Sequence, residues 1–235
     1  MVSKSLQSTL EGQLKFERFS AVIFDLDGTL VDSVPDLSLA INHALVQLSL
    51  PVVTEPQVRF WVGNGSRKLV ERSLNAHNIS DAETIERLHK AFLESYQQFL
   101  CADSILYPAV NDLLLQLADH NIPMGLVTNK PIAFVPKLLE SLNIHHFFDV
   151  IIGGDSLPEK KPSPLPLIHV AQALGFEPQT CLMVGDSASD VLSAQSAKMP
   201  CVLLEQGYNQ GQDLALLKPD WLLATTQELH EAFGF

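Results

Sequence analysis

Two carboxylates stand one residue apart at the end of a short apolar run near the start of the chain. Asp25 and Asp27 follow the apolar residues 21–24, and Gly28 and Thr29 come next. The apolar run is typical of a strand buried on both faces, and Gly28 lets the backbone leave strand geometry. The two carboxylates could therefore approach one reacting atom from different sides.

Three further polar residues, Thr128, Lys161 and Asp186, complete a set suited to phosphoryl chemistry. Mg²⁺ takes one or two carboxylates together with water and phosphate oxygens, which makes Asp25 and Asp186 the best metal ligands. One carboxylate could act as a nucleophile, and another could protonate a leaving oxygen and later deprotonate a water. Thr128 could donate to a phosphoryl oxygen, and Lys161 would offset the negative charge.

The elements that position these residues follow from the order of apolar runs. Short runs end near residues 127, 152, 185 and 204, and segments with helical spacing separate them. Strands that alternate with helices predict an α/β fold with a doubly wound parallel sheet. Ligands bind beyond the carboxyl ends of such strands, so Asp25, Thr128 and Asp186 should converge there.

Residues 35–105 have a different pattern, with apolar residues at helical spacing and no strand signal. Because this block lies between the first strand and the others, we expect a helical cap inserted into the α/β core. The predicted organisation is a polar, partly disordered extension over 1–20, a core of 21–34 plus 106–235, and an all-helical cap over 35–105.

Composition narrows the class of protein. The 235 residues include 27 acidic and 15 basic side chains, and a net charge of -12 disfavours nucleic acid as a partner. No apolar run is long enough for a membrane span, and no signal segment is seen. Cys101, Cys181 and Cys201 lack the spacing of a disulfide framework or zinc site. We expect a cytoplasmic protein, as a monomer or homodimer.

Four segments together resemble the motifs of the haloacid dehalogenase superfamily of phosphotransferases. They occur in the expected order and are Asp25-Leu26-Asp27-Gly28-Thr29-Leu30-Val31-Asp32-Ser33, Val127-Thr128-Asn129-Lys130, Lys160-Lys161-Pro162-Ser163-Pro164 and Val184-Gly185-Asp186-Ser187-Ala188-Ser189-Asp190. The resemblance implies a Rossmann-like core, a Mg²⁺ cofactor and an aspartyl-phosphate intermediate. It also implies that Asp25 is the nucleophile and a metal ligand. Asp27 is then the general acid/base with its backbone carbonyl on the metal, and Asp186 completes the metal site.

The same resemblance assigns roles around the phosphoryl group. Thr128 and Asn129 would hold this group and Lys161 would neutralise it, while Asp190 would orient Lys161 and Asp186 from behind. Taken singly, Thr128, Asn129 and Asp186 could be helix caps, and Lys161 could belong to a solvated charge run. The ordered occurrence of all four motifs favours the catalytic interpretation.

Within the superfamily, the chain is similar to bacterial phosphoglycolate phosphatases. Residues 61–66, Trp-Val-Gly-Asn-Gly-Ser, resemble that family's cap loop. Asn64 and Arg67 could contact a substrate carboxylate, since arginine forms bidentate pairs with carboxylates; alternatively, they belong to loop structure and a solvated helix face. The predicted function is hydrolysis of a small phosphorylated metabolite, 2-phosphoglycolate first.

Two other functions stay open at the level of sequence. One is a phosphatase or phosphomutase that acts on a small sugar phosphate. The other is a non-catalytic, metabolite-binding regulatory protein on the same fold. The presence of both Asp25 and Asp27 argues against the second alternative, because a protein that performs no chemistry needs neither carboxylate.

Overall fold

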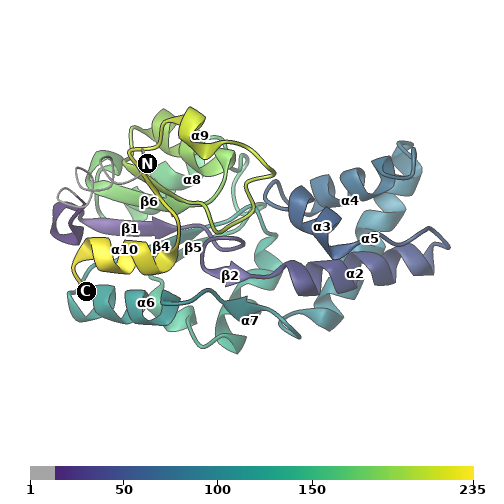
Figure 1. The fold of residues 1–235 in the computed structure, drawn as a ribbon, viewed down its shortest axis with the longest axis horizontal. Coiled ribbons are helices and arrows are strands. Elements are labelled where there is room, and N and C mark those ends of the chain that lie inside the picture. The colour runs from purple at the N-terminus through teal and green to yellow at the C-terminus, as the bar shows by residue number, and fades with distance from the viewer. Residues whose placement is uncertain (1–13) are drawn as a thin grey trace, which may run out of the picture.

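The computed structural model describes residues 14–235 and has a parallel β-sheet at its centre (Figure 1). Within that range the sheet contains six strands in the order β5-β4-β1-β6-β7-β8. They are β1 (Ala21–Phe24), β4 (Met124–Val127), β5 (Val150–Ile152), β6 (Cys181–Gly185), β7 (Cys201–Leu204) and β8 (Trp221–Leu223). Strand β1 pairs in parallel with β4 on one side and with β6 on the other. The predicted α/β class with a doubly wound parallel sheet is confirmed.

Helices cover both faces of this sheet. One face carries α6 (Val110–Asp119), α7 (Val135–Ser141) and α10 (Thr226–Phe233), and the other carries α8 (Leu165–Ala173) and α9 (Ala188–Ala197) (Figure 1). Successive side chains of a strand point to opposite faces. Accordingly, Val22 and Phe24 of β1 pack in the first hydrophobic cluster, and Ala21 and Ile23 pack in the second. This explains why four consecutive apolar residues are all buried.

A second group of helices forms a cap at one end of the molecule (Figure 1). It consists of α2 (Val34–Gln47), α3 (Glu55–Trp61), α4 (Ser66–Asn75) and α5 (Ala82–Phe99), which share a hydrophobic cluster of their own. A short antiparallel ribbon of β2 (Val31–Asp32) and β3 (Ile105–Leu106) joins the two passages of the chain between core and cap. The predicted cap limits, 35–105, stay a prediction.

Local sequence signals account for the ends of the cap helices. Asp81 accepts a hydrogen bond from the Thr84 amide at the start of α5, as an N-cap residue does. Helix α3 was not expected from periodicity, because it is only seven residues long. Its signal is instead the capping box formed by Thr54 and Gln57.

The stretch from residue 14 to residue 20 differs from the polar extension expected for 1–20. Leu14, Phe16 and Phe19 are buried, and they join the cluster that contains Phe233 of α10. The short 3-10 helix η1 (Phe16–Arg18) places these apolar side chains on the core. Residues 1–13, which belong to the same predicted extension, lie outside the described residues.

Short 3-10 helices lie in several connections of the chain. They are η2 (Ile132–Phe134), η3 (His145–Phe147), η4 (Pro178–Thr180) and η5 (Leu214–Leu217).

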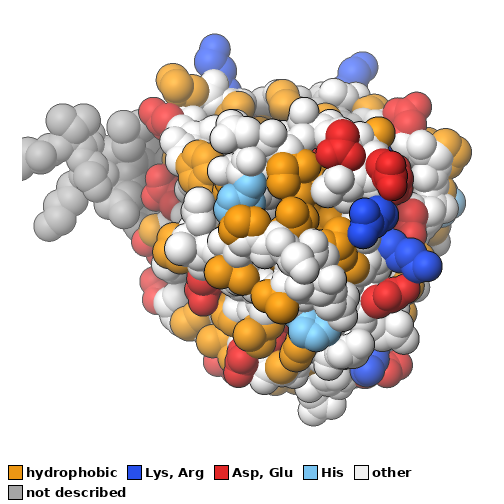
Figure 2. Space-filling view, turned by 90° about the vertical axis from the view of Figure 1, so that its right-hand side faces the viewer, with side chains coloured by type: hydrophobic (Ala, Val, Ile, Leu, Met, Phe, Trp, Pro, Cys, Tyr) orange, Lys and Arg blue, Asp and Glu red, His pale blue; other side chains and the backbone are white. Residues whose placement is uncertain are grey.

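The outer surface at the cap end carries both apolar and polar side chains. Figure 2 looks onto the cap end, where hydrophobic side chains lie among charged and other polar ones. Exposed apolar residues of the cap include Val46, Val52 and Phe60. No helix within residues 14–235 combines the length and the apolar character that crossing a membrane requires.

Candidate active site

The polar residues singled out by the sequence meet at the carboxyl edge of the sheet. Asp25 directly follows β1, Thr128 follows β4 and Asp186 follows β6. These three strands are neighbours in the order β4-β1-β6, so their carboxyl ends lie side by side. The sheet therefore brings together residues that are up to 161 positions apart in the chain.

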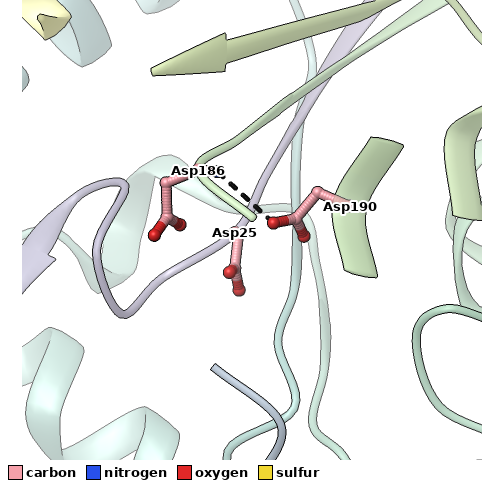
Figure 3. Close-up of side chains that lie close together, drawn as sticks. All are labelled: Asp25, Asp186 and Asp190. Carbon is pink, nitrogen blue, oxygen red and sulfur yellow. Dashed lines mark hydrogen bonds between the residues drawn. The ribbon is translucent and has the colours of Figure 1, made fainter. Parts of the chain in front are cut away.

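Three carboxylates form a compact buried cluster (Figure 3). Asp25, Asp186 and Asp190 each present an oxygen, and these oxygens lie within 4.8 Å of one another. Burial raises the pKa of Asp25 to about 7; Lys161 opposes this rise and Asp190 adds to it. Burial, followed by repulsion from Asp25 and Asp190, raises the pKa of Asp186 well above its ordinary range. The cluster thus concentrates more negative charge than its own surroundings neutralise.

Two elements hold the Asp186 carboxylate in place. Thr29 donates a hydrogen bond from its hydroxyl to Oδ1 over 2.7 Å, and the Tyr208 amide donates to Oδ2 over 2.6 Å. Glycines let both segments approach, because a Cβ on Gly28 or Gly207 would lie 2.2 or 2.3 Å from an Asp186 side-chain atom. The turn after β1 and the loop after β7 thus jointly fix one carboxylate.

Asp190 has a different environment, since its acceptor positions are occupied. At the start of α9, its Oδ2 accepts hydrogen bonds from the Ser187 amide (3.0 Å), the Ser187 hydroxyl (2.6 Å) and the Asp186 amide (3.3 Å). Figure 3 shows the last of these bonds as a dashed line. Its Oδ1 accepts a 2.6 Å hydrogen bond from Lys161 Nζ. Asp190 is therefore placed to orient Lys161 and the Asp186 backbone.

Lys161 links the cluster to the Asp25 carboxylate. Its Nζ lies 2.9 Å from Asp25 Oδ1 and 2.6 Å from Asp190 Oδ1, and its side chain has no exposed surface. Burial alone would lower the pKa of Lys161, but Asp190 and Asp25 raise it above its ordinary value. A permanent positive charge therefore lies against Asp25.

Asp27 has a separate cation. Its carboxylate oxygens lie 2.8 and 2.9 Å from Lys130 Nζ, and Oδ1 also accepts a 2.5 Å hydrogen bond from the Ser33 hydroxyl. Burial acts to lower the pKa of Lys130, but Asp27 more than compensates and raises it. No role for Lys130 was predicted from the sequence. The available signal was its position directly after Thr128 and Asn129.

Thr128 and Asn129 occupy the loop between β4 and η2. Both are buried, and both line the cavity described below. The Asn129 side-chain amide donates to the carbonyl oxygens of Gly63 in the cap and Lys161 in the core, each over 3.2 Å. Its Oδ1 has no partner among the described residues. Asn129 therefore bridges the two parts of the molecule beside the Asp25 and Asp27 carboxylates.

A cavity lies between the core and the cap. Core residues on its wall include Asp25, Asp27 and the segment 128–131. The cap contributes a mostly apolar wall, which comprises Leu37, Val62, Gly63, Gly65, Ser66, Leu69, Phe92, Leu93 and Tyr96. A small substrate can therefore meet the carboxylates while the cap shields it from bulk water.

The two cap residues proposed from the sequence as substrate contacts do not line this cavity. The Asn64 amide oxygen accepts hydrogen bonds from Arg72 and Gln210, both over 2.7 Å. Arg67 is about half exposed and pairs with Glu71 and Glu86. The periodicity of α4 explains this placement, because Leu69, Val70, Ser73 and Leu74 form its buried side. The structure thus favours loop structure for Asn64 and a solvated helix face for Arg67.

The residues present fit a divalent cation. All donors at the cluster are oxygens, which suits a hard metal ion. Asp25 Oδ1 makes a close ion pair with Lys161 but has no hydrogen-bond partner among the described residues. Burial and the neighbouring carboxylates raise the pKa values of Asp25 and Asp186, and a metal ion would supply the further positive charge that favours their ionised forms. Asp25 and Asp186 are the best placed ligands, since each Asp186 oxygen accepts a single hydrogen bond, whereas Asp190 Oδ2 accepts three and Asp190 Oδ1 is paired with the Lys161 ammonium.

Comparisons with known proteins agree with this geometry. A profile of the haloacid dehalogenase-like hydrolases matches residues 22–204. The phosphoglycolate phosphatase of Yersinia pestis is 44% identical over 222 residues, covering 94% of this chain and 96% of the relative. That of Escherichia coli K12 is 41% identical over 238 residues, with 94% of each chain covered. The crystal structure of a predicted phosphoglycolate phosphatase from Haemophilus somnus superposes with a TM-score of 0.85 at 36% identity, covering 91% of this chain and 97% of that one.

Proposed function

We propose that this chain converts 2-phosphoglycolate to glycolate and phosphate. The chain belongs to the haloacid dehalogenase-like hydrolases and is a phosphoric monoester hydrolase. The substrate assignment is supported by the names of relatives that match nearly the whole chain at 41–44% identity. One observation carries the chemistry: Asp25 lies on the cavity wall with Lys161 Nζ 2.9 Å from its carboxylate and Asp27 nearby on the same wall.

The proposed reaction has two displacements at phosphorus. In the first, an Asp25 oxygen forms a bond to phosphorus while the bond to the glycolate oxygen breaks, and Asp27 gives that oxygen a proton. In the second, Asp27 takes a proton from a water, the water oxygen attacks phosphorus, and the aspartyl-phosphate bond breaks. Asp25 and Asp27 both return to their starting forms.

The other site residues would stabilise charge during these steps. Thr128 and Asn129 would hold phosphoryl oxygens, and the Lys161 ammonium would offset their negative charge. Asp190 would keep Lys161 in place through their 2.6 Å hydrogen bond. Asp25, Asp186 and the backbone carbonyl of Asp27 would hold Mg²⁺, which when bound supplies charge neutralisation at the phosphoryl group.

The cellular setting belongs to the same proposal. Three free cysteines fit the reducing cytoplasm expected from the sequence. The cap, with expected limits 35–105, would close over the small substrate. Whether the chain acts as a monomer or a homodimer stays a prediction.

The test is phosphate release from 2-phosphoglycolate, hexose phosphates, nucleoside monophosphates and pyrophosphate, with Mg²⁺ and with EDTA. We expect preferential turnover of 2-phosphoglycolate that EDTA abolishes. Asp25→Asn should lose at least about 10³-fold in rate, because it removes the nucleophile. The matched control is Asp119→Asn, an exposed residue at the end of α6, which should keep full activity.

Each other outcome points to a different function. Preference for a hexose phosphate would replace the proposed substrate and keep the mechanism. Phosphoryl transfer to a sugar acceptor in place of water would identify a mutase. No turnover of any substrate by the intact chain would favour the non-catalytic binding protein.

A further inference from the structure

The cavity wall contains one ammonium group, that of Lys130 from the core, and one buried hydroxyl, that of Tyr96 from the cap, whose hydrogen has no acceptor among the described residues. We propose that Lys130 and Tyr96 form a binding subsite for the substrate's carboxylate, so that the enzyme selects phosphomonoesters that carry a carboxylate close to the phosphoryl group. This inference rests on the proposed function and extends it to residues for which no role was predicted.

Lys130 is the one cation among the described residues that line the cavity. Its side chain is 3% exposed, so it is held in one place. An ammonium group has three N–H donors; two of them contact Asp27, and the remaining one faces Tyr96, which also interacts with this ammonium group. Its Nζ also lies 4.9 Å from the centre of the Tyr96 ring. The charge of Lys130 thus lies between the core carboxylate and the cap wall.

Other nearby cations are already committed elsewhere. Lys161 contacts Asp25 and Asp190. Lys160 donates to the backbone carbonyl of Asn64, and Arg67 pairs with Glu71 and Glu86. None of these three residues lines the cavity. Lys130 also pairs with Asp27, but among the described residues it is the one ammonium group on the cavity wall that a carboxylate entering with the phosphoryl group could contact.

Tyr96 supplies the second, independent observation. This residue of α5 is 1% exposed and lines the cavity; Lys130 lies close enough to interact with its oxygen, but its hydroxyl hydrogen has no acceptor among the described residues. Burial raises the pKa of Tyr96 to about 12, so the hydroxyl keeps its proton and remains a donor. Buried polar groups are normally paired. A carboxylate oxygen of the substrate would satisfy this hydroxyl while it contacts Lys130.

The placement also sets the size of the substrate. Lys130 follows Thr128, a proposed phosphoryl ligand, by only two residues in one loop, and the Lys130 amide donates to the Thr128 hydroxyl over 3.2 Å. The phosphoryl and carboxylate groups must therefore be close together in the substrate. Leu69, Phe92 and Phe134 make the surrounding wall apolar, which strengthens a charge–charge contact and offers little to a neutral polar group.

The experiment compares two substrates that differ only in whether they carry the carboxylate. 2-Phosphoglycolate carries the carboxylate, and 2-hydroxyethyl phosphate has a hydroxymethyl group in its place. The measured quantity is the ratio of their kcat/KM values. In Lys130→Met we expect this ratio to fall by about 10- to 100-fold, as loss of a hydrogen bond to a charged group predicts. In Tyr96→Phe we expect a fall of about 3- to 10-fold.

Matched controls separate the subsite from general effects. Lys137→Met removes an exposed lysine of α7, and Tyr107→Phe removes another unpartnered hydroxyl that is not on the cavity wall. Both should leave the ratio unchanged. Because Lys130 contacts Asp27, Lys130→Met should also lower kcat for both substrates, and the ratio cancels that shared loss. An unchanged ratio in Lys130→Met would overturn the subsite.

A binding measurement decides the inference independently of turnover. Calorimetry in the presence of Mg²⁺ would compare 3-phosphonopropionate, which has the carboxylate, with propylphosphonate, which lacks it. Wild type should prefer the first, and Lys130→Met should lose that preference; equal preference in both proteins overturns the subsite. Wild type that binds in this way but does not hydrolyse 2-phosphoglycolate would refute the proposed function and leave the subsite supported.

Discussion

Two lysines at this site pair with different carboxylates, and each neutralises part of the negative charge. Lys161 lies against Asp25 and Asp190, and Lys130 lies against Asp27. With Asp186 included, four carboxylates face two ammonium groups, so the site carries excess negative charge. That excess shows in the pKa of Asp25, which is raised to about 7 by burial and by Asp190 despite Lys161. A divalent cation bound at this site would neutralise the excess negative charge.

The pH dependence of metal binding follows from Asp25. Its pKa is higher in the folded chain than its ordinary value of 3.8, so between about pH 4 and 7 the folded state binds more protons than the unfolded state. Without metal, the stability contributed by protonated Asp25 is therefore full below about pH 4 and is lost as pH rises through about 7. An Mg²⁺ ion held by the Asp25 carboxylate, as proposed, would have to displace that proton, so we expect it to bind better at higher pH.

We therefore expect the increase in Tm caused by Mg²⁺ to be larger at about pH 8 than at about pH 5.5. Below the pKa of Asp25, competition from one proton should weaken apparent metal affinity by about tenfold per pH unit. Thermal unfolding with Mg²⁺ or with NaCl of equal ionic strength measures the effect. Asp25→Asn should show a smaller shift with a weaker pH dependence, and the part that remains comes from Asp186, whose pKa burial also raises. A shift of equal size at both pH values in wild type would contradict this account.

At the scale of elements, the site depends on two connections that meet at Asp186. The turn after β1 contributes the Thr29 hydroxyl, and the loop after β7 contributes the Tyr208 amide. Gly28 is required for two reasons: its φ is +93°, and a Cβ there would lie 2.2 Å from Asp186 Oδ2. The first reason concerns stability, and the second concerns the position of Asp186, a proposed metal ligand.

A pair of glycine substitutions separates those two effects. Gly28→Ala and Gly175→Ala both place alanine at a φ near +90°, which costs roughly 1–2 kcal/mol of stability in each. A Cβ at Gly175 meets nothing within 4 Å, whereas one at Gly28 displaces Asp186. We expect only Gly28→Ala to lose activity, by about 10- to 100-fold, together with metal affinity. Equal activity of the two variants in phosphate-release assays would refute the steric argument.

At the scale of the whole molecule, polar contacts hold the cap loop against the core. The Gln210 side-chain amide, in the loop after β7, donates to the Val62 carbonyl over 2.8 Å and to Asn64 Oδ1 over 2.7 Å. Arg72 of the cap donates to Asn64 and, over 3.3 Å, to Gln210. Asn129 reaches the Gly63 carbonyl from the catalytic edge. The cap loop is therefore held by the loops after β4 and β7, both of which also contribute residues to the site.

Shortening Gln210 should weaken this closure. Gln210→Asn keeps an amide and tolerates the local φ of 56°, but it withdraws the side chain from Val62 and Asn64. We expect KM to rise by about 3- to 10-fold, since two hydrogen bonds are lost, with a smaller effect on kcat. Steady-state kinetics measures this split. Gln212→Asn, at an exposed neighbouring position, should behave as wild type. Unchanged KM in Gln210→Asn would show that these contacts do not limit closure.

Much of this organisation could be predicted from local sequence. The apolar runs before Asp25, Thr128 and Asp186 predict strands because their length and flanking turns leave few alternatives, and parallel strands must align their carboxyl ends. The α/β class and the acidic cluster follow from that logic. By contrast, α3 was missed because seven residues give too little periodicity, and β2 and β3 have only two residues each.

What the sequence by itself determined is which polar residues follow the strands at the carboxyl edge of the sheet, because strand ends and turn chemistry are written locally in the chain. Only the tertiary structure decided what each side chain meets there. There Asp190 accepts hydrogen bonds from Lys161 and Ser187, and burial raises the pKa values of Asp25 and Asp186. The phase of α4 turned Arg67 outward, and the approach of core and cap placed Lys130 between Asp27 and Tyr96. Such contacts join segments far apart in the chain, so no local pattern encodes them.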